Sequence, residues 1–168
     1  PSSYNGVVGL KPTYGRNSRY GIVAFASSLD QVGPITRTVA DNALLEEIIA
    51  GACEHDETTL KLNVPSYTKA IRHSIKGVKI GVVEEVDSLF KTNRHYEKYN
   101  AIYKWFEENG AEVVRVNVAN IKLALPSYYI LAPAEASSNL GRFDGVRYTY
   151  RDPEAKNLND IYVKSRTK

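Results

Sequence analysis

The apolar positions of the chain change period along its length. After Thr38, which is a good N-cap, apolar residues recur at three- and four-residue spacing until Gly51 ends the run. The residues of this stripe are Val39, Ala43, Leu44, Ile48 and Ile49. We therefore expect a helix over 39–49 that buries one apolar face. Upstream, residues 6–10 are typical of a short buried strand, and residues 27–34 of a loop.

A strand, a helix and a second strand follow one another in the next part of the chain. Residues 77–83 are rich in β-branched side chains, residues 96–106 place aromatic side chains on one helical face, and residues 111–118 alternate. Short connections between such elements predict a βαβ unit with two parallel strands. We expect the aromatic face to belong to the core rather than to a ligand site. The fold class is therefore α/β.

Three further helices are expected. A short one covers about 67–73, and a last one covers about 158–165. The longest, over 121–139, contains Pro126 and Pro133, which predict a kink or a division into two shorter helices.

Composition limits the possible classes of function. The 168 residues match one domain, and a net charge of +3 is too small to indicate a nucleic-acid or membrane-surface protein. No apolar stretch approaches the 18 to 20 residues or so that a membrane-spanning helix needs. Cys53 is the single cysteine, and the three histidines lack the spacing of metal ligands, so we expect no metal site. The sequence contains no Met and begins at Pro1, which favours an internal piece or a processed chain.

The pair Tyr128-Tyr129 is the most suggestive chemistry that the residues offer by themselves. It follows Pro126-Ser127, and small residues come after it. Small residues allow close backbone approach, and a tyrosine hydroxyl there can donate a hydrogen bond to a ligand or accept one. The pattern alone still favours a structural role. The glycines near the N-terminus do not have the spacing of a phosphate-binding loop.

Two long blocks resemble a known family. Residues 6–41, GVVGLKPTYGRNSRYGIVAFASSLDQVGPITRTVAD, closely resemble the amidase signature family, although Asn17 stands where an apolar residue is usual. Residues 126–148, PSYYILAPAEASSNLGRFDGVRY, resemble the branch of that family that forms the glutaminase subunits of tRNA-dependent amidotransferases. The resemblance implies the amidase signature fold, a large mixed β-sheet core covered by helices on both faces. It also implies that residues 1–168 are the central fragment of a single amidase domain whose N- and C-terminal parts are missing.

The resemblance assigns few site residues to this chain. The family's catalytic Lys, bridging Ser and nucleophilic Ser align upstream of Pro1, so we expect no catalytic residue here and no activity of the chain alone. Tyr128 aligns with the tyrosine that hydrogen-bonds the bound glutamine. Ser28 and Asp30 lie in a loop that we expect to support that site.

The implied function is acyl transfer from glutamine, which releases ammonia. The B and C subunits of a heterotrimer would be the partners, with misacylated tRNA, ATP and Mg²⁺ handled by the partner in the cytoplasm and no cofactor held by these residues. Two alternatives remain: a fragment of a free-standing amidase that acts on another small amide, and a non-catalytic interaction module. The block from Arg142 to Tyr148 argues against the free-standing amidase, because it resembles the amidotransferase branch specifically.

Overall fold

The computed structural model describes residues 1–144 and 146–168. In the N-terminal part, a single 3₁₀ turn (η1) precedes two very short strands and two helices. Their bounds are Ser3–Asn5 for η1, Val8–Gly9 for β1, Ile35–Thr36 for β2, Val39–Ile49 for α1 and Tyr67–Ala70 for α2. Strands β1 and β2 are antiparallel, with Val8 opposite Thr36. The predicted strand at 6–10 and the predicted short helix are therefore present, both shorter than expected.

Helix α1 begins where its capping signal predicts and buries a face that was not predicted. The Thr38 hydroxyl accepts a hydrogen bond from the Asp41 N–H at 3.1 Å. The buried residues of the helix, however, are Asn42 and Glu46. The expected apolar stripe is wrong for this chain, since Ile48, for example, is 70% exposed. The face that meets the N-terminal loops is polar because Asn42 donates hydrogen bonds to backbone carbonyls there.

The βαβ unit is confirmed. Strand β3 (Lys79–Val83) and strand β4 (Glu112–Val116) are parallel, with Lys79 opposite Glu112 and Val83 opposite Val116. Between them lie α3 (Glu84–Phe90) and the aromatic helix α4 (Tyr96–Glu108). Helix α3 was not predicted, because it starts directly from β3 without a side-chain cap. No residue of α4 is fully buried within this chain.

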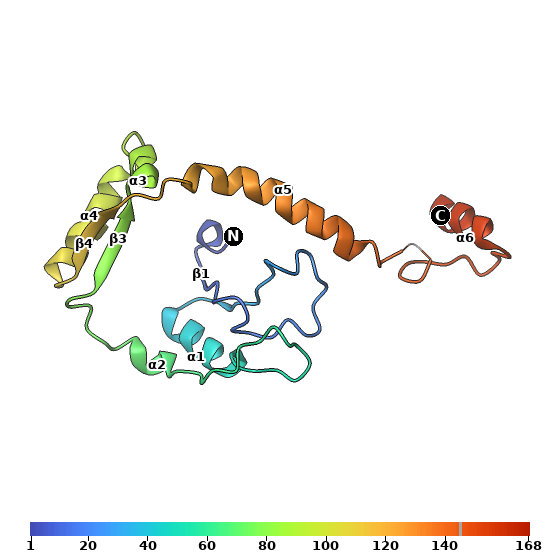
Figure 1. Cartoon of the computed structure of the whole chain (residues 1–168), viewed down its shortest axis with the longest axis horizontal. Coiled ribbons are helices and arrows are strands. Elements are labelled where there is room, and N and C mark those ends of the chain that lie inside the picture. Colours follow the sequence, from blue (N-terminus) through green and yellow to red (C-terminus); the bar gives the residue numbers. More distant parts are fainter. Residues whose placement is uncertain (145) are drawn as a thin grey trace.

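Helix α5 (Ile121–Leu140) is continuous through Pro126 and Pro133. The predicted division into two helices does not occur, although each proline removes one backbone hydrogen bond. The last helix, α6 (Leu158–Thr167), begins at Asn157, whose side chain accepts from the Asp160 N–H. Figure 1 shows α5 as one bowed ribbon that leads from the βαβ unit toward α6.

These elements form an open arrangement rather than one thick layer structure. In Figure 1, the βαβ unit lies at one side, α1 and the N-terminal loops lie below α5, and α6 lies at the far end. The described residues form two two-stranded sheets, one antiparallel and one parallel. The α/β class is confirmed, and the few buried apolar side chains are mostly small, such as Ala26 and Ala132.

Candidate functional site

The loop that carries Ser28 and Asp30 is held in shape by the Asp30 carboxylate. Its two oxygens accept hydrogen bonds from the backbone N–H groups of Phe25 at 2.9 Å and Ala26 at 3.1 Å. The Ala26 carbonyl in turn accepts from the N–H groups of Leu29 and Asp30. Ala26 is only 1% exposed. Asp30 therefore acts as the internal brace of residues 25–30, and its support of a substrate site stays a prediction.

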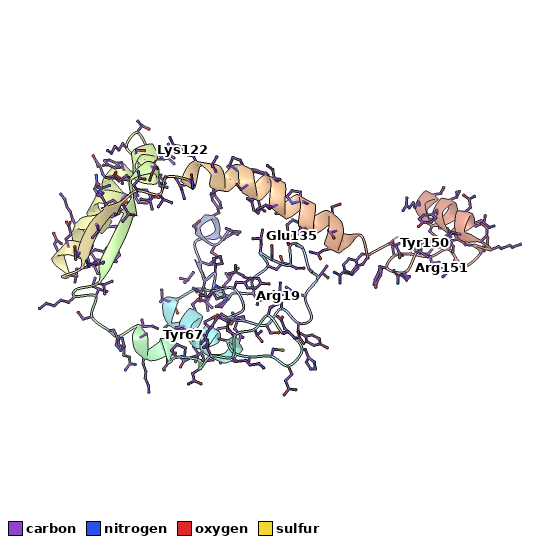
Figure 2. The ribbon with its side chains drawn as sticks, viewed as in Figure 1. Arg19, Tyr67, Lys122, Glu135, Tyr150 and Arg151 are labelled. Carbon is purple, nitrogen blue, oxygen red and sulfur yellow. The ribbon has the colours of Figure 1, made fainter. Side chains whose placement is uncertain are left out.

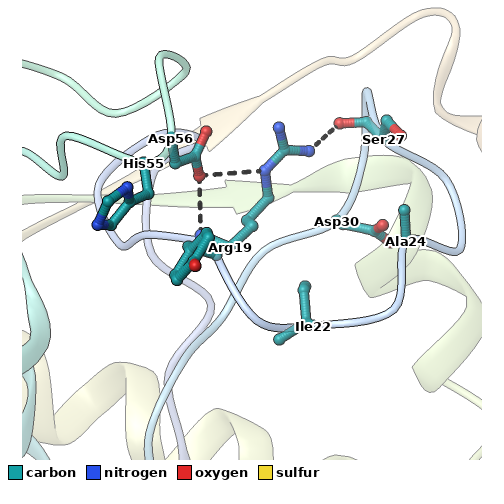
Figure 3. Close-up of a pocket in the computed structure, with 8 residues that line it drawn as sticks. Arg19, Ile22, Ala24, Ser27, Asp30, His55 and Asp56 are labelled. Carbon is teal, nitrogen blue, oxygen red and sulfur yellow. Dashed lines mark hydrogen bonds and ion pairs between the residues drawn. The ribbon is translucent and has the colours of Figure 1, made fainter.

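A small cavity lies on one side of this loop (Figure 3). It has a volume of about 190 Å³, and Arg19, Asp30 and Asp56 are among the residues that line it. The Arg19 guanidinium donates to the Ser27 carbonyl, and its Nε lies 3.7 Å from the Asp56 carboxylate. Hydrogen bonds from Thr58 and from the Arg19 N–H lower the pKa of Asp56 to about 2. Most of these polar groups pair with one another, although the buried Arg19 Nε makes no hydrogen bond within the described residues, so the cavity is a braced loop junction.

Ser28 is not among the residues that line this cavity, and it binds α5 instead. Its N–H donates to Glu135 Oε2 at 3.0 Å, and its hydroxyl donates to Glu135 Oε1. One turn further along α5, Asn139 Nδ2 donates to the Phe25 carbonyl at 3.2 Å. The hydrogen bonds from Ser28 lower the pKa of Glu135, which is therefore ionised at neutral pH. Figure 2 shows Glu135 on α5, above the loops of the N-terminal part.

Tyr128 lies on α5, seven residues before Glu135, and is 52% exposed. Its ring meets that of Tyr129 edge-on, with the centroids 5.7 Å apart. Residues seven apart on a helix share a face, so Tyr128 and Glu135 point in similar directions. The structure thus places Tyr128 on the helix that the Ser28 loop binds. It records no direct hydrogen bond between Tyr128 and either Ser28 or Asp30 among the described residues.

The sequence reasoning missed the groups that connect these parts. Glu135, Asn139, Arg19 and Asp56 were not singled out. Glu135 carries a signal that could have found it: between Lys122 and Arg142 it is the only charged residue. Glu135 is the one acidic residue of α5, and the Ser28 loop supplies two hydrogen-bond donors to its carboxylate.

Within residues 1–144 and 146–168, no three His, Cys, Asp or Glu side chains converge as a metal-binding group. No helix in the described part of the chain is both long and apolar enough to cross a membrane.

The chain belongs to the amidase family, whose sequence profile matches residues 1–168. Within that family, it is 50% identical over 167 residues to the A subunit of glutamyl-tRNA(Gln) amidotransferase from Lactiplantibacillus plantarum. That match covers 99% of this chain and 34% of the relative. The corresponding protein of Geobacillus thermodenitrificans is also 50% identical over 167 residues. The chain therefore spans about a third of the length of the curated relatives it matches.

Solved structures give the same family. The crystal structure of the A subunit of glutamyl-tRNA(Gln) amidotransferase from Thermotoga maritima matches with a TM-score of 0.74 and 49% identity, over 80% of this chain and 29% of that one. The native peptide amidase of Stenotrophomonas maltophilia matches with a TM-score of 0.75 and 29% identity, over 97% of this chain and 33% of that one. The expected amidase signature fold is thus confirmed.

Proposed function

We propose that this chain is the central part of the glutamine-hydrolysing component of a tRNA-dependent amidotransferase. The observation that carries the proposal is identity: about half of the residues are shared with relatives of that name over almost the whole chain. The peptide amidase has a similar TM-score but shares 29% of residues. The same backbone fold therefore occurs in proteins with both activities, and the higher sequence identity favours the amidotransferase.

In this proposal the reaction is divided between this chain and segments outside it. Those segments supply the Lys and the two Ser, and the nucleophilic Ser attacks the side-chain amide of glutamine and expels ammonia. Water then releases glutamate from the acyl-enzyme. This chain contributes Tyr128, whose hydroxyl holds the bound glutamine, and the loop braced by Asp30. The residues described here supply no cofactor site in this scheme.

The ammonia would pass to a partner protein. The complex would be a heterotrimer of the subunit that contains this chain with the B and C subunits. That partner would use ATP and Mg²⁺ to activate the glutamyl group of misacylated Glu-tRNA(Gln), and ammonia would convert it to Gln-tRNA(Gln). The whole reaction belongs in the cytoplasm, where aminoacyl-tRNA is used. The small net charge of +3 on this chain agrees with RNA being bound by the partner.

The test uses the full-length protein that contains this chain. Tyr128→Phe removes one neutral hydrogen bond, so we expect the KM for glutamine to rise about two- to tenfold. Tyr129→Phe is the matched control, since its neighbouring hydroxyl has no assigned role, and its KM should stay unchanged. An unchanged KM in Tyr128→Phe would count against the assignment of that residue.

A second measurement distinguishes the alternatives. Co-purification with a tRNA-binding partner, and glutamine-dependent formation of Gln-tRNA(Gln) by that complex, would support the amidotransferase. Hydrolysis of other small amides by the protein alone, without such a partner, would instead identify a free-standing amidase. If the full-length protein hydrolyses no amide at all, it would be an interaction module.

A further inference from the structure

Helix α5 is joined to the N-terminal loops by two side chains, Glu135 and Asn139. Among the described residues, three hydrogen bonds link the helix to any segment beyond its immediate flanks. Two run from Ser28 to Glu135, and one runs from Asn139 to the Phe25 carbonyl. They connect parts of the chain that are 107 and 114 residues apart in sequence. The placement of α5 on the loop therefore depends on a small number of groups.

The same face of α5 carries Tyr128. Seven residues of helix advance about 10 Å along the axis and return to within about 20° of the starting direction. Tyr128 and Glu135 therefore lie almost in line, with Ala132 between them near the same face. Ala132 is 1% exposed and Ala136 is 8% exposed, so this face is packed against protein on both sides of Glu135. Because α5 is one continuous helix, a shift at Glu135 is transmitted to Tyr128.

The contact is suited to a carboxylate, because a charged acceptor makes both of its hydrogen bonds stronger. Ser28 presents two donors, its N–H and its hydroxyl, and each oxygen of Glu135 accepts one of them. A glutamine there could still accept from the Ser28 N–H, while its NH₂ group could donate to the Ser28 hydroxyl, but the bonds would no longer be to a charged group. The other carboxylate near Glu135 is Asp30, which braces the loop through its own backbone hydrogen bonds.

We propose that Glu135 is a positioning residue for the substrate site: by holding Ser28, it fixes the Tyr128 face of α5 against the loop at residues 25–30. The proposal rests on the proposed function, in which Tyr128 binds glutamine. Glu135 itself need not touch the substrate. Its loss should let α5 move relative to the loop and should weaken glutamine binding more than the chemical step.

The experiment measures glutamine hydrolysis by the full-length protein. For Glu135→Ala we expect the KM for glutamine to rise by no more than the roughly two- to tenfold of Tyr128→Phe, because Glu135 acts through that hydroxyl, with kcat changed less than about threefold. Glu135→Gln should fall between the parent protein and Glu135→Ala, because it can keep its hydrogen bonds to Ser28 without the charge. Glu97→Ala, which removes an exposed carboxylate on α4, is the matched control and should behave as the parent protein.

Two double variants separate positioning from a purely structural effect. Ser28→Ala combined with Glu135→Ala should be no worse than Glu135→Ala alone, because both changes break one contact. In a Tyr128→Phe background, Glu135→Ala should raise the KM less than it does in the parent, because the hydroxyl that it positions is already gone. An equal rise in both backgrounds would overturn the proposal.

The outcomes also separate this inference from the proposed function. If Tyr128→Phe raises the KM and Glu135→Ala does not, the positioning role is wrong while the glutamine assignment stands. If Tyr128→Phe has no effect, the proposed role of Tyr128 fails, and the positioning role fails with it whatever Glu135→Ala does. A fall in kcat with unchanged KM in Glu135→Ala would show that the residue only maintains the amount of folded enzyme, and would also overturn the inference.

Discussion

Replacing both members of the buried Asn17–Glu46 pair with apolar residues should cost far less stability than the two single replacements together. Asn17 is 4% exposed and Glu46 is 2% exposed. Asn17 Nδ2 donates to Glu46 Oε2 and to the Val32 carbonyl, both at 2.9 Å. In the described part of the chain, Asn17 Oδ1 and Glu46 Oε1 have no hydrogen-bond partner. The pair is therefore buried and only partly satisfied.

The magnitudes follow from what each change leaves behind. Asn17→Val removes both hydrogen bonds and leaves the Glu46 carboxylate buried without a donor, at a cost of about 3 kcal/mol. Glu46→Leu leaves the bond from Asn17 to Val32 intact and should cost about 1 kcal/mol. In the double variant only the Val32 carbonyl loses a partner, and added apolar burial offsets that loss. The double variant should therefore lie within about 1 kcal/mol of the parent, so the coupling energy is about 3 to 4 kcal/mol.

The assay is urea unfolding of the full-length protein and its three variants, followed by fluorescence. Asn63→Val, at an exposed loop asparagine, is the control and should change the stability by less than about 0.5 kcal/mol. If the double variant is destabilised by as much as the two single variants together, the two side chains are energetically independent and the reasoning is refuted.

Two further predictions concern the loops around the site. Gly33→Ala should destabilise the full-length protein strongly, because its new Cβ would lie 2.0 Å from the Leu10 carbonyl oxygen. Gly81→Ala should be tolerated, because its Cβ would lie 3.6 Å from the nearest atom. Equal melting temperatures of the two variants would contradict this prediction. The carboxylate of Asp56, whose folded pKa is lowered to about 2, stabilises the fold above its ordinary pKa of 3.8, and that contribution is lost as the pH falls from about 4 to about 2. Asp56→Asn should therefore flatten the loss of stability over that range in acid unfolding, and an unchanged acid profile would disprove the role of the carboxylate.

The elements that local signals define could be predicted from the sequence. Helix α1 begins at Thr38 because its hydroxyl caps the Asp41 N–H, and this requires only neighbouring residues. The parallel pairing of β3 and β4 followed from two strand patterns with a helical pattern between them. Helix α3 was missed because it has no side-chain cap and follows β3 without a loop.

What could not be predicted depends on contacts between distant segments. The hydrogen bond between Ser28 and Glu135 joins residues that are 107 apart in the sequence, and no hydrophobic periodicity in either segment predicts it. The burial of Glu46 is a similar case, because a charged residue inside a helix is expected to face solvent. Tyr128 was assigned by resemblance, and its role in binding glutamine remains a prediction.

The exposed apolar face of α1 is part of an unusually large solvent-accessible surface of the whole chain. The chain exposes 12937 Å², whereas a compact monomer of its mass, 18.7 kDa, exposes about 8,300 Å². The excess includes residues that the 39–49 pattern predicted to be buried, such as Val39 and Leu44. Their spacing is that of a core face, so we propose that a segment outside residues 1–168 covers them in the longer protein. The relatives are about three times as long, and our proposal that this chain is the centre of a larger amidase domain provides that layer from the remaining two thirds. The error about α1 thus supports the proposal, because a helix that buries polar residues inward and exposes an apolar stripe is stable only when a further segment covers the stripe.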